Sequence, residues 1–278
     1  CSIVYESYYF WEFSFFNDTA FGIAATFSEL SKYAERLNSK PEIKTKSLTS
    51  LRHSGYVRVE RGSAVGLLDV APVGPDYLPG HAHADTLSFE LSMFGYRVFV
   101  NSGISQYGDN ALRQKQRSTA LHNTVCINGA DSSEVWAGFR VARRAYPGVL
   151  SIENKNNEVK VSCCHNGYKR LLGKCIHIRE WVFKDHSICI TDKISGEYKS
   201  AMANFYIHPA IKVNAVDGMQ NVFYLETPSG KMLKVTVENS EKSELIPSQW
   251  YPQFGTSINN QCISVEFSCP KITTMIEW

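Results

Sequence analysis

The sequence lacks most of the features that mark specialised classes of protein. Its eight cysteines include no CxxC pair, which argues against a cysteine-rich metal site and against a disulfide framework. Lysine and arginine nearly balance aspartate and glutamate, so the formal charge of +2 provides no strong field for nucleic acid or an acidic membrane. No apolar run is long enough to span a bilayer, and no repeat has propeller or solenoid length. We therefore expect no nucleic-acid partner and no membrane span.

What the chain has is 278 residues, 44% of them hydrophobic, which suits one large domain or two small ones. Over most of its length apolar and polar residues alternate with a period of two, as in half-buried strands. These runs lie at 56–59, 87–91, 96–100, 159–162, 181–183, 188–191, 222–225, 233–237 and 263–267. Turn dipeptides fall between them at Asn128-Gly129, Asp217-Gly218 and Ser229-Gly230. Many short strands separated by turns predict a mainly β fold, a large antiparallel two-sheet sandwich.

The beginning of the chain has a different period. Apolar residues recur at three- and four-residue steps over 20–37, which predicts a helix with Asn17 or Asp18 as its N-cap. The aromatic cluster at 8–16 needs a surface to pack against and is expected to belong to a helical body. Residues 38–49 read as a linker. The predicted organisation is a helical remnant with its linker over residues 1–48, followed by the sandwich over 49–278.

The residues best suited to chemistry gather between His81 and His122. His81 and His83 are two positions apart, so on an extended backbone both rings can face one cavity. With His122 they form a candidate for metal binding or for proton transfer. The plainer alternative is that the loop histidines only hydrogen-bond nearby carbonyls. A cupin site also opens with HxH but needs a glutamate sooner than Glu90, so that spacing fails.

An ordered series of motifs makes this region resemble the heparinase II/III-like lyases. The series is GHAHADTLSFEL at 80–91, YRVFVNSG at 96–103, QYG at 106–108 and RSTALHNTVCINGADSSEVWAGFRVARRA at 117–145. It continues with HNGY at 165–168, HIR at 177–179, IHP at 207–209 and YPQFG at 251–255. Motifs in this order over roughly residues 55–269 are far more specific than one short pattern.

The resemblance implies an N-terminal helical toroid, a C-terminal β-sandwich and a cleft for an anionic polysaccharide between them. Such enzymes cleave uronic-acid-containing polymers by β-elimination, which needs a base for the C5 proton, an acid for the leaving oxygen and neutralisation of the carboxylate. This chain would supply mainly the sandwich. A toroid, in cis or in trans, would be the partner needed for activity.

The resemblance also implies roles for single residues. His81 matches a histidine of the catalytic cleft, assigned to proton transfer or carboxylate contact, and Tyr107 matches a tyrosine able to act as the acid. A packed aromatic is the alternative for Tyr107. His83, Asn101 and His122 match the ligands of a zinc ion that holds loops in place. The family usually has Asp at the middle position, and the uncharged amide of Asn101 is expected to weaken zinc binding.

Asp85 is a possible substitute for the missing acidic ligand. Among residues that could bind substrate, Arg117 and Arg140 fall inside the motif blocks and could pair with carboxylates or sulfates. Trp136 could stack on a sugar face. The alternatives are solvated surface charge for either arginine, a loop-orienting role for Arg140, and a core position for Trp136.

Two functions stay open from the sequence. The first is the C-terminal part of a polysaccharide lyase, and the second is a non-catalytic carbohydrate-binding or assembly module that keeps the lyase fold. Polymer lyases are generally exported, which favours the periplasm or the extracellular space, whereas the cysteines would also suit the reducing cytoplasm. No organic cofactor is expected.

Overall fold

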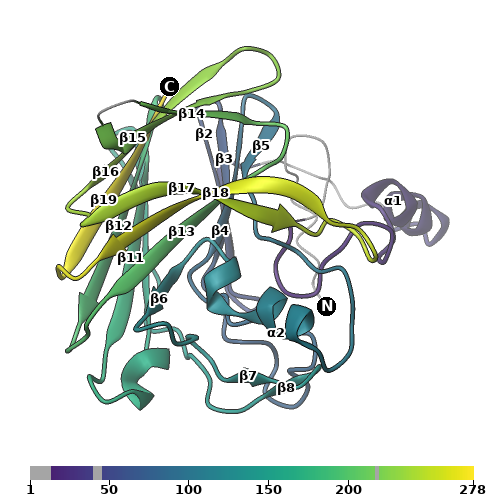
Figure 1. Cartoon of the computed structure of the whole chain (residues 1–278). Helices are drawn as coiled ribbons and strands as arrows, with labels where there is room; N and C mark the ends of the chain where they lie inside the picture. The colour runs from purple at the N-terminus through teal and green to yellow at the C-terminus, as the bar shows by residue number, and fades with distance from the viewer. Residues whose placement is uncertain (1–13, 40–45, 217–218) are drawn as a thin grey trace.

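The computed structural model describes residues 14–39, 46–216 and 219–278, and its main feature is a pair of large antiparallel sheets (Figure 1). In the described residues the first sheet has nine strands in the order β1-β2-β3-β4-β5-β13-β18-β17, with β6 paired to β13. These strands are β1 (Leu48–Leu51), β2 (Tyr56–Arg61), β3 (Ala64–Asp69), β4 (Phe89–Met93), β5 (Tyr96–Phe99), β6 (Val125–Ile127), β13 (Ala201–Ile207), β17 (Lys242–Trp250) and β18 (Ile258–Phe267).

The second sheet has eight strands in the described ranges, in the order β14-β15-β16-β19-β12-β11-β10-β9. They are β9 (Ser151–Lys155), β10 (Glu158–His165), β11 (Ile176–Phe183), β12 (Ser187–Ser195), β14 (Lys212–Val216), β15 (Met219–Glu226), β16 (Met232–Glu238) and β19 (Lys271–Glu277). A small hairpin of β7 (Val135–Trp136) and β8 (Arg140–Val141) stands apart. The predicted antiparallel two-sheet sandwich is therefore confirmed.

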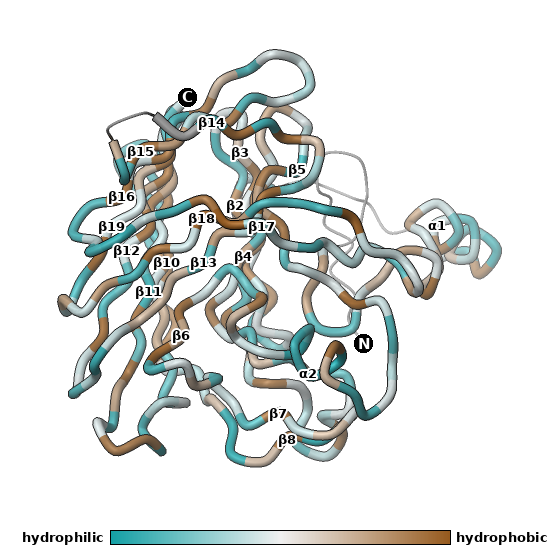
Figure 2. The backbone as a smooth tube through the Cα atoms, viewed as in Figure 1, coloured by the Kyte–Doolittle hydropathy of each residue, from teal (hydrophilic) through white to brown (hydrophobic). Residues whose placement is uncertain are grey.

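Alternation of buried and half-buried residues explains why these segments form strands around one core. Along β10 and β11 every second side chain is buried. Figure 2 shows hydrophobic and hydrophilic stretches following one another along the strands, and in β11 the buried positions include the hydrophilic His177 and Arg179. Buried residues of both sheets, such as Phe89 and Phe205 from the first and Trp181 from the second, form one apolar cluster. The core thus fills the space between the two sheets.

The sequence pattern located nine strands and overlooked others. Each predicted run overlaps a strand, although the run at 87–91 begins too early because Leu87 has a φ of 66° and forms a turn before β4. The run over β3 was overlooked because all six of its residues are buried, which removes the alternation. Asn128 and Gly129 both have positive φ, as the predicted hairpin turn requires. Asp217-Gly218 lies outside the described residues.

The predicted helix over 20–37 is too long, and its predicted caps are wrong. The observed helix α1 is Phe27–Arg36, and its N-cap is Thr26. The Thr26 hydroxyl accepts a hydrogen bond from the Glu29 backbone N–H, and the Glu29 carboxylate accepts one from the Thr26 backbone N–H. This capping box begins the helix after residues 20–25. A second helix, α2 (Ala111–Arg117), begins at Asn110. Neither α1 nor α2, the two α-helices in the described part of the chain, is long and apolar enough to cross a membrane.

The segment before α1 packs on the first sheet. Phe15 is fully buried against Phe21 and Trp250, with ring centroids 5.0 and 5.3 Å away. The backbone N–H of Phe15 donates to the carboxylate of Glu90 in β4 over 3.1 Å. Phe15 and Phe16 thus pack on the first sheet, whereas the membership of the aromatic cluster in a helical body stays a prediction, since the rest of that cluster lies outside the described residues. The predicted linker ends earlier than expected, because β1 begins at Leu48.

Candidate active site and metal centre

His81 and His83 lie in the loop between β3 and β4, and both contact the carboxylate of Asp18. His81 Nδ1 lies 2.9 Å from Asp18 Oδ2, and His83 Nε2 lies 2.8 Å from Asp18 Oδ1. The two rings differ in environment: the His81 side chain is 63% exposed, whereas His83 is fully buried. One histidine is thus available to a ligand from solution, and the other is part of the interior.

Asp18 is held in place by Arg113 of α2. The two terminal nitrogens of the guanidinium donate to the two carboxylate oxygens, and Nε donates to the carbonyl of Gly138 over 2.9 Å. Although burial opposes ionisation, the hydrogen bonds from His83 and Arg113 hold the pKa of Asp18 well below its usual range. A buried, ionised carboxylate therefore lies between the two histidines.

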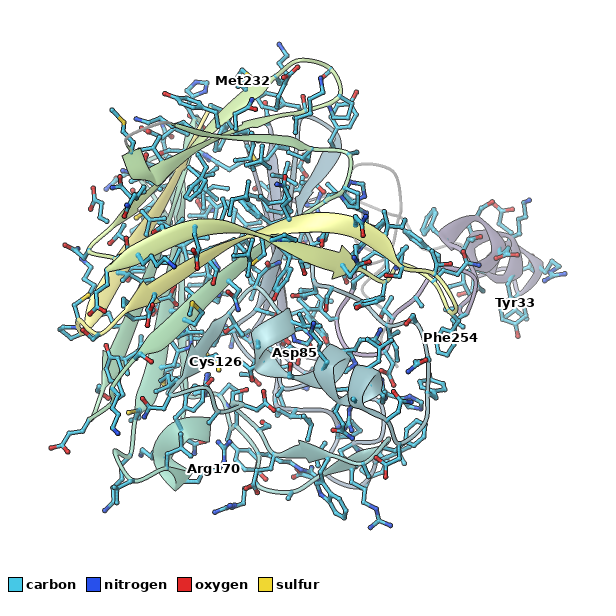
Figure 3. The ribbon with its side chains drawn as sticks, viewed as in Figure 1. Tyr33, Asp85, Cys126, Arg170, Met232 and Phe254 are labelled. Carbon is cyan, nitrogen blue, oxygen red and sulfur yellow. The ribbon has the colours of Figure 1, made fainter. Side chains whose placement is uncertain are left out.

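His83, Asp85 and His122 form a buried group that could hold a metal ion. Each offers one ligand atom, and the three atoms lie within 4.8 Å of one another. His83 Nδ1 is 3.0 Å from His122 Nε2, and His122 Nδ1 is 2.7 Å from the carbonyl oxygen of Ser118. Figure 3 labels Asp85 in the middle of the molecule, and it is buried. The group lies beneath the surface rather than on it.

Burial determines how these groups ionise without a metal. It lowers the pKa of His83, and it lowers the pKa of His122 to about 3. Burial also raises the pKa of Asp85 to about 7. Neutral imidazoles are the form in which histidine binds a metal. Two imidazole nitrogens and one carboxylate oxygen at this separation fit the donor set of a zinc ion.

Asn101, the residue at the expected middle position, has other partners. Its side-chain oxygen accepts a hydrogen bond from the Asn123 backbone N–H over 3.1 Å, and its backbone N–H donates to the Glu90 carboxylate over 2.8 Å. Asp85 is the acidic residue that lies with the two histidines. The alternative ligand weighed from the sequence is thus the one that the fold brings into the cluster.

Tyr107 lies beside His81 at the surface. Its hydroxyl is 3.5 Å from His81 Nδ1, and its ring packs on Phe139 and Phe254 with centroids 5.2 and 4.8 Å away. Burial, together with the charge of Asp18, raises the pKa of Tyr107. The residue is 38% exposed, so it is both a packed aromatic and a group that a ligand can reach. Figure 3 shows Phe254 near the edge of the molecule.

The predicted substrate-binding residues separate into a buried one and two exposed ones. Arg117 is fully buried and donates to the carbonyls of Ala82, Ala137 and Arg140 over 3.0–3.1 Å. Its expected contact with substrate is contradicted by this geometry, since its guanidinium holds loops together. Arg140 is exposed and lies over the ring of Trp136, which is 50% exposed, at 5.1 Å. These two remain available to a ligand.

Sequence reasoning overlooked a buried polar network behind the site. Arg179 and Asp192, on neighbouring strands β11 and β12, form two hydrogen bonds of 2.7 and 2.9 Å, and His177 Nε2 lies 2.6 Å from Asp192 Oδ1. Arg179 also donates to the carbonyls of Leu87 and Asn123. These two carbonyls belong to the loops that carry the metal-site residues. The sequence signals were that HIR at 177–179 stands among the family motifs and that its polar residues occupy inward positions of the strand alternation.

Comparison with solved structures shows which known proteins share this fold. The heparan sulfate lyase HepC from Pedobacter heparinus matches 99% of this chain with a TM-score of 0.77 and 14% identity, and a heparinase III matches 98% with a TM-score of 0.75 and 17% identity. A second heparinase III structure covers 95%, with a TM-score of 0.73 and 16% identity. At such identities the likeness shows the fold alone. The chain spans only 44 to 45% of the length of these proteins.

Sequence comparison assigns the family. No curated protein sequence matches the chain. The family model described as heparinase II/III-like, C-terminal, matches residues 43–278, which is most of the chain. The chain therefore belongs to the heparinase II/III-like family, of which it contains the C-terminal domain.

Proposed function

We propose that this chain is the sandwich half of a polysaccharide lyase that cleaves a uronic-acid-containing polymer by β-elimination. The observation that carries the proposal is the exposed pair of His81 and Tyr107, with a carboxylate behind the histidine and aromatic rings beside the tyrosine. An imidazole and a phenol side by side can move the two protons that the reaction requires. Membership of the heparinase II/III-like family supports the same reaction class.

In the proposed reaction the C5–H bond of the uronate breaks, and its proton passes to the imidazole of His81. The electron pair forms the C4=C5 double bond while the C4–O4 bond breaks, and the departing O4 takes a proton from the hydroxyl of Tyr107. The raised pKa of Tyr107 keeps this phenol protonated at neutral pH, which suits an acid. Neutralisation of the uronate carboxylate is assigned to the toroid half, present in cis or in trans.

We assign a zinc ion to His83, Asp85 and His122 as part of this proposal. When bound, the ion would supply a positive charge that ties the loop before β4 to the segment around His122. The three ligands would then be fixed relative to one another. Because His81 is two positions from the ligand His83, its backbone would be held in place as well. A bound zinc would thus help these residues to hold the shape of the site.

Binding of the polymer is assigned to the exposed surface next to this pair. Trp136 offers an aromatic face on which a sugar ring can stack, and Arg140 can pair with a carboxylate or sulfate. The ligand is therefore proposed to be an anionic polysaccharide.

The test is an assay of the complete gene product, including any upstream segment encoded with it, on heparan sulfate, alginate and bacterial capsule. The unsaturated uronate formed by β-elimination absorbs in the ultraviolet, so absorbance reports each cleavage. We expect His81→Ala to lower kcat/KM at least about 100-fold, the usual contribution of a proton-transfer residue. His186→Ala, an exposed histidine between β11 and β12, is the matched control and should keep wild-type activity. No rise in absorbance on any of these polymers would refute the lyase assignment.

The exposed Trp136–Arg140 pair also favours a second candidate, a carbohydrate-binding module without catalysis. Such a module would bind the same polymers, as measured by calorimetry, without forming the unsaturated product. Binding with no product from the complete gene product would select this second function.

A further inference from the structure

Asp18 is unusual because one buried carboxylate contacts both a candidate catalytic residue and a candidate metal ligand. Its two oxygens are divided between the rings, Oδ2 to His81 at 2.9 Å and Oδ1 to His83 at 2.8 Å. The Asp18 side chain is only 4% exposed, and Arg113 donates to both of its carboxylate oxygens. It belongs to the segment before α1, outside the range 43–278 that the family model matches.

The contacts with Asp18 specify which nitrogen of each histidine carries a proton. A carboxylate paired with an arginine is ionised and can only accept hydrogen bonds. His81 must therefore donate through Nδ1–H, and His83 through Nε2–H. In a neutral imidazole the other nitrogen has a lone pair, so Nε2 of His81 and Nδ1 of His83 are left free to accept a proton or a metal.

The neighbouring histidine completes the pattern. A carbonyl oxygen also only accepts, so His122 donates to Ser118 through Nδ1–H and keeps a lone pair on Nε2. This lone pair faces that of His83 Nδ1 at 3.0 Å. Two lone pairs that face each other this closely repel unless a cation lies near both, and the carboxylate of Asp85 is within 4.8 Å of these atoms. The tautomer imposed by Asp18 therefore aims His83 at a shared cation position.

We propose that Asp18 is a positioning residue that fixes the tautomers of His81 and His83, leaving His81 Nε2 free toward the substrate and His83 Nδ1 free for a zinc ion shared with His122. The part concerning His81 rests on the proposed lyase function, whereas the part concerning zinc does not. The segment before the family domain is thus a working part of the site. A carboxylate behind a metal-binding histidine commonly orients the ring and raises its affinity for the metal.

The first test reads the tautomers in the wild-type protein, so that it does not depend on any variant folding. The protein is labelled with ¹⁵N-histidine, loaded with zinc and examined by two-dimensional ¹H–¹⁵N spectra that resolve both ring nitrogens. We expect the proton on Nδ1 of His81, on Nε2 of His83 and on Nδ1 of His122. A proton on Nδ1 of His83, or on Nε2 of His81 in the neutral form, would overturn the proposal.

The second test compares Asp18→Asn with Asp76→Asn. Asp76 is an exposed aspartate that also pairs with an arginine, Arg144, so it is a matched control with no histidine contact. Competition with a chromophoric chelator measures the zinc affinity. We expect Asp18→Asn to weaken it by about 10- to 100-fold, the usual effect of removing such a partner, and Asp76→Asn to leave it unchanged. Equal zinc affinities of wild type and Asp18→Asn would overturn the proposal.

The same two variants separate this inference from the proposed function. If the gene product is a lyase, Asp18→Asn should lower kcat with little change in KM, because substrate binding does not involve the buried carboxylate. If it cleaves no polymer, the zinc affinities and the tautomers still decide the role of Asp18. Asp18→Asn leaves the charge of Arg113 buried without a carboxylate, which could destabilise the fold. The unfolding of Asp18→Asn is therefore compared with that of the double variant Asp18→Asn/Arg113→Gln, which removes both charges. The double variant should show the same loss of zinc affinity.

Discussion

Replacing Asp192 with asparagine should destabilise the protein strongly, although the change adds no bulk. Asp192 and Arg179 are both fully buried and share two hydrogen bonds, and His177 donates a third to the same carboxylate. The amide of asparagine has nearly the same shape but no charge. The substitution therefore leaves the guanidinium of Arg179 buried with only neutral partners.

The expected size of the effect follows from this geometry. Removing one partner of a buried ion pair typically costs about 3–5 kcal/mol. The network also lowers the pKa of Asp192 from 3.8 to about 2 against the opposing effect of burial, which corresponds to roughly 2 kcal/mol of pH-dependent stability. Because the folded-state pKa is depressed, this contribution is complete well above pH 3.8 and is lost as pH falls through 2. About 1 kcal/mol of it should be lost by pH 3.

Urea unfolding followed by tryptophan fluorescence measures both effects. At pH 7 the free energy of unfolding of Asp192→Asn should be about 3–5 kcal/mol below that of the wild type, and at pH 3 the gap should be about 1 kcal/mol smaller. Glu180→Gln is the matched control, since Glu180 pairs with Lys160 on the outward side of neighbouring strands and should contribute less than about 1 kcal/mol. A gap at pH 7 no larger than that of the control would refute the role assigned to the buried pair.

Three further outcomes are expected. Removal of metal with a chelator should lower the thermal transition temperature of the protein, and added zinc should restore it, with elemental analysis showing one zinc ion per chain. A protein that never takes up zinc would contradict the assignment of His83 and His122. Trp136→Ala should raise KM or Kd for the polymer about tenfold with kcat little changed, measured by calorimetry and by initial rates. Gly103→Ala should cost about 1–3 kcal/mol in urea unfolding, because φ is +74° and an added Cβ would lie 2.3 Å from the Tyr251 carbonyl; Gly230→Ala, also at positive φ but with open space, should cost less.

The fold could be predicted well from the sequence because a strand with one buried face shows alternating apolar and polar residues within a short segment. A strand with one face in the core alternates visibly, as β10 and β11 do. Where both faces are buried, as in β3, the alternation vanishes and the strand is missed. The helix was misplaced for a related reason: residues 20–25 have helical spacing, but Phe21 packs on Phe15 and Trp250 instead.

Only those site residues that belong to recognisable family motifs could be predicted from the sequence. His81, His83 and His122 could be chosen because they stand in recognisable motifs, and the structure brings the last two together with Asp85. Asp18 could not be chosen, since a lone aspartate before an apolar run indicates a helix cap and its partners lie 63 and more residues away. The charge of Arg117 was visible in the sequence, but its burial depends on the loops that fold around it.

Three buried arginines explain how loops without regular hydrogen-bond ladders can hold a site. Arg113 binds Asp18, Arg179 binds Asp192, and Arg117 binds only backbone carbonyls. Burial lowers the pKa of Arg117 to about 10, which still leaves it charged at neutral pH. The guanidinium donors thus satisfy loop carbonyls that no strand pairs with, and two of the three charges are balanced by carboxylates. The remaining positive charge, that of Arg117, adds to the effect of burial in lowering the pKa of His83, which favours the neutral form of this imidazole.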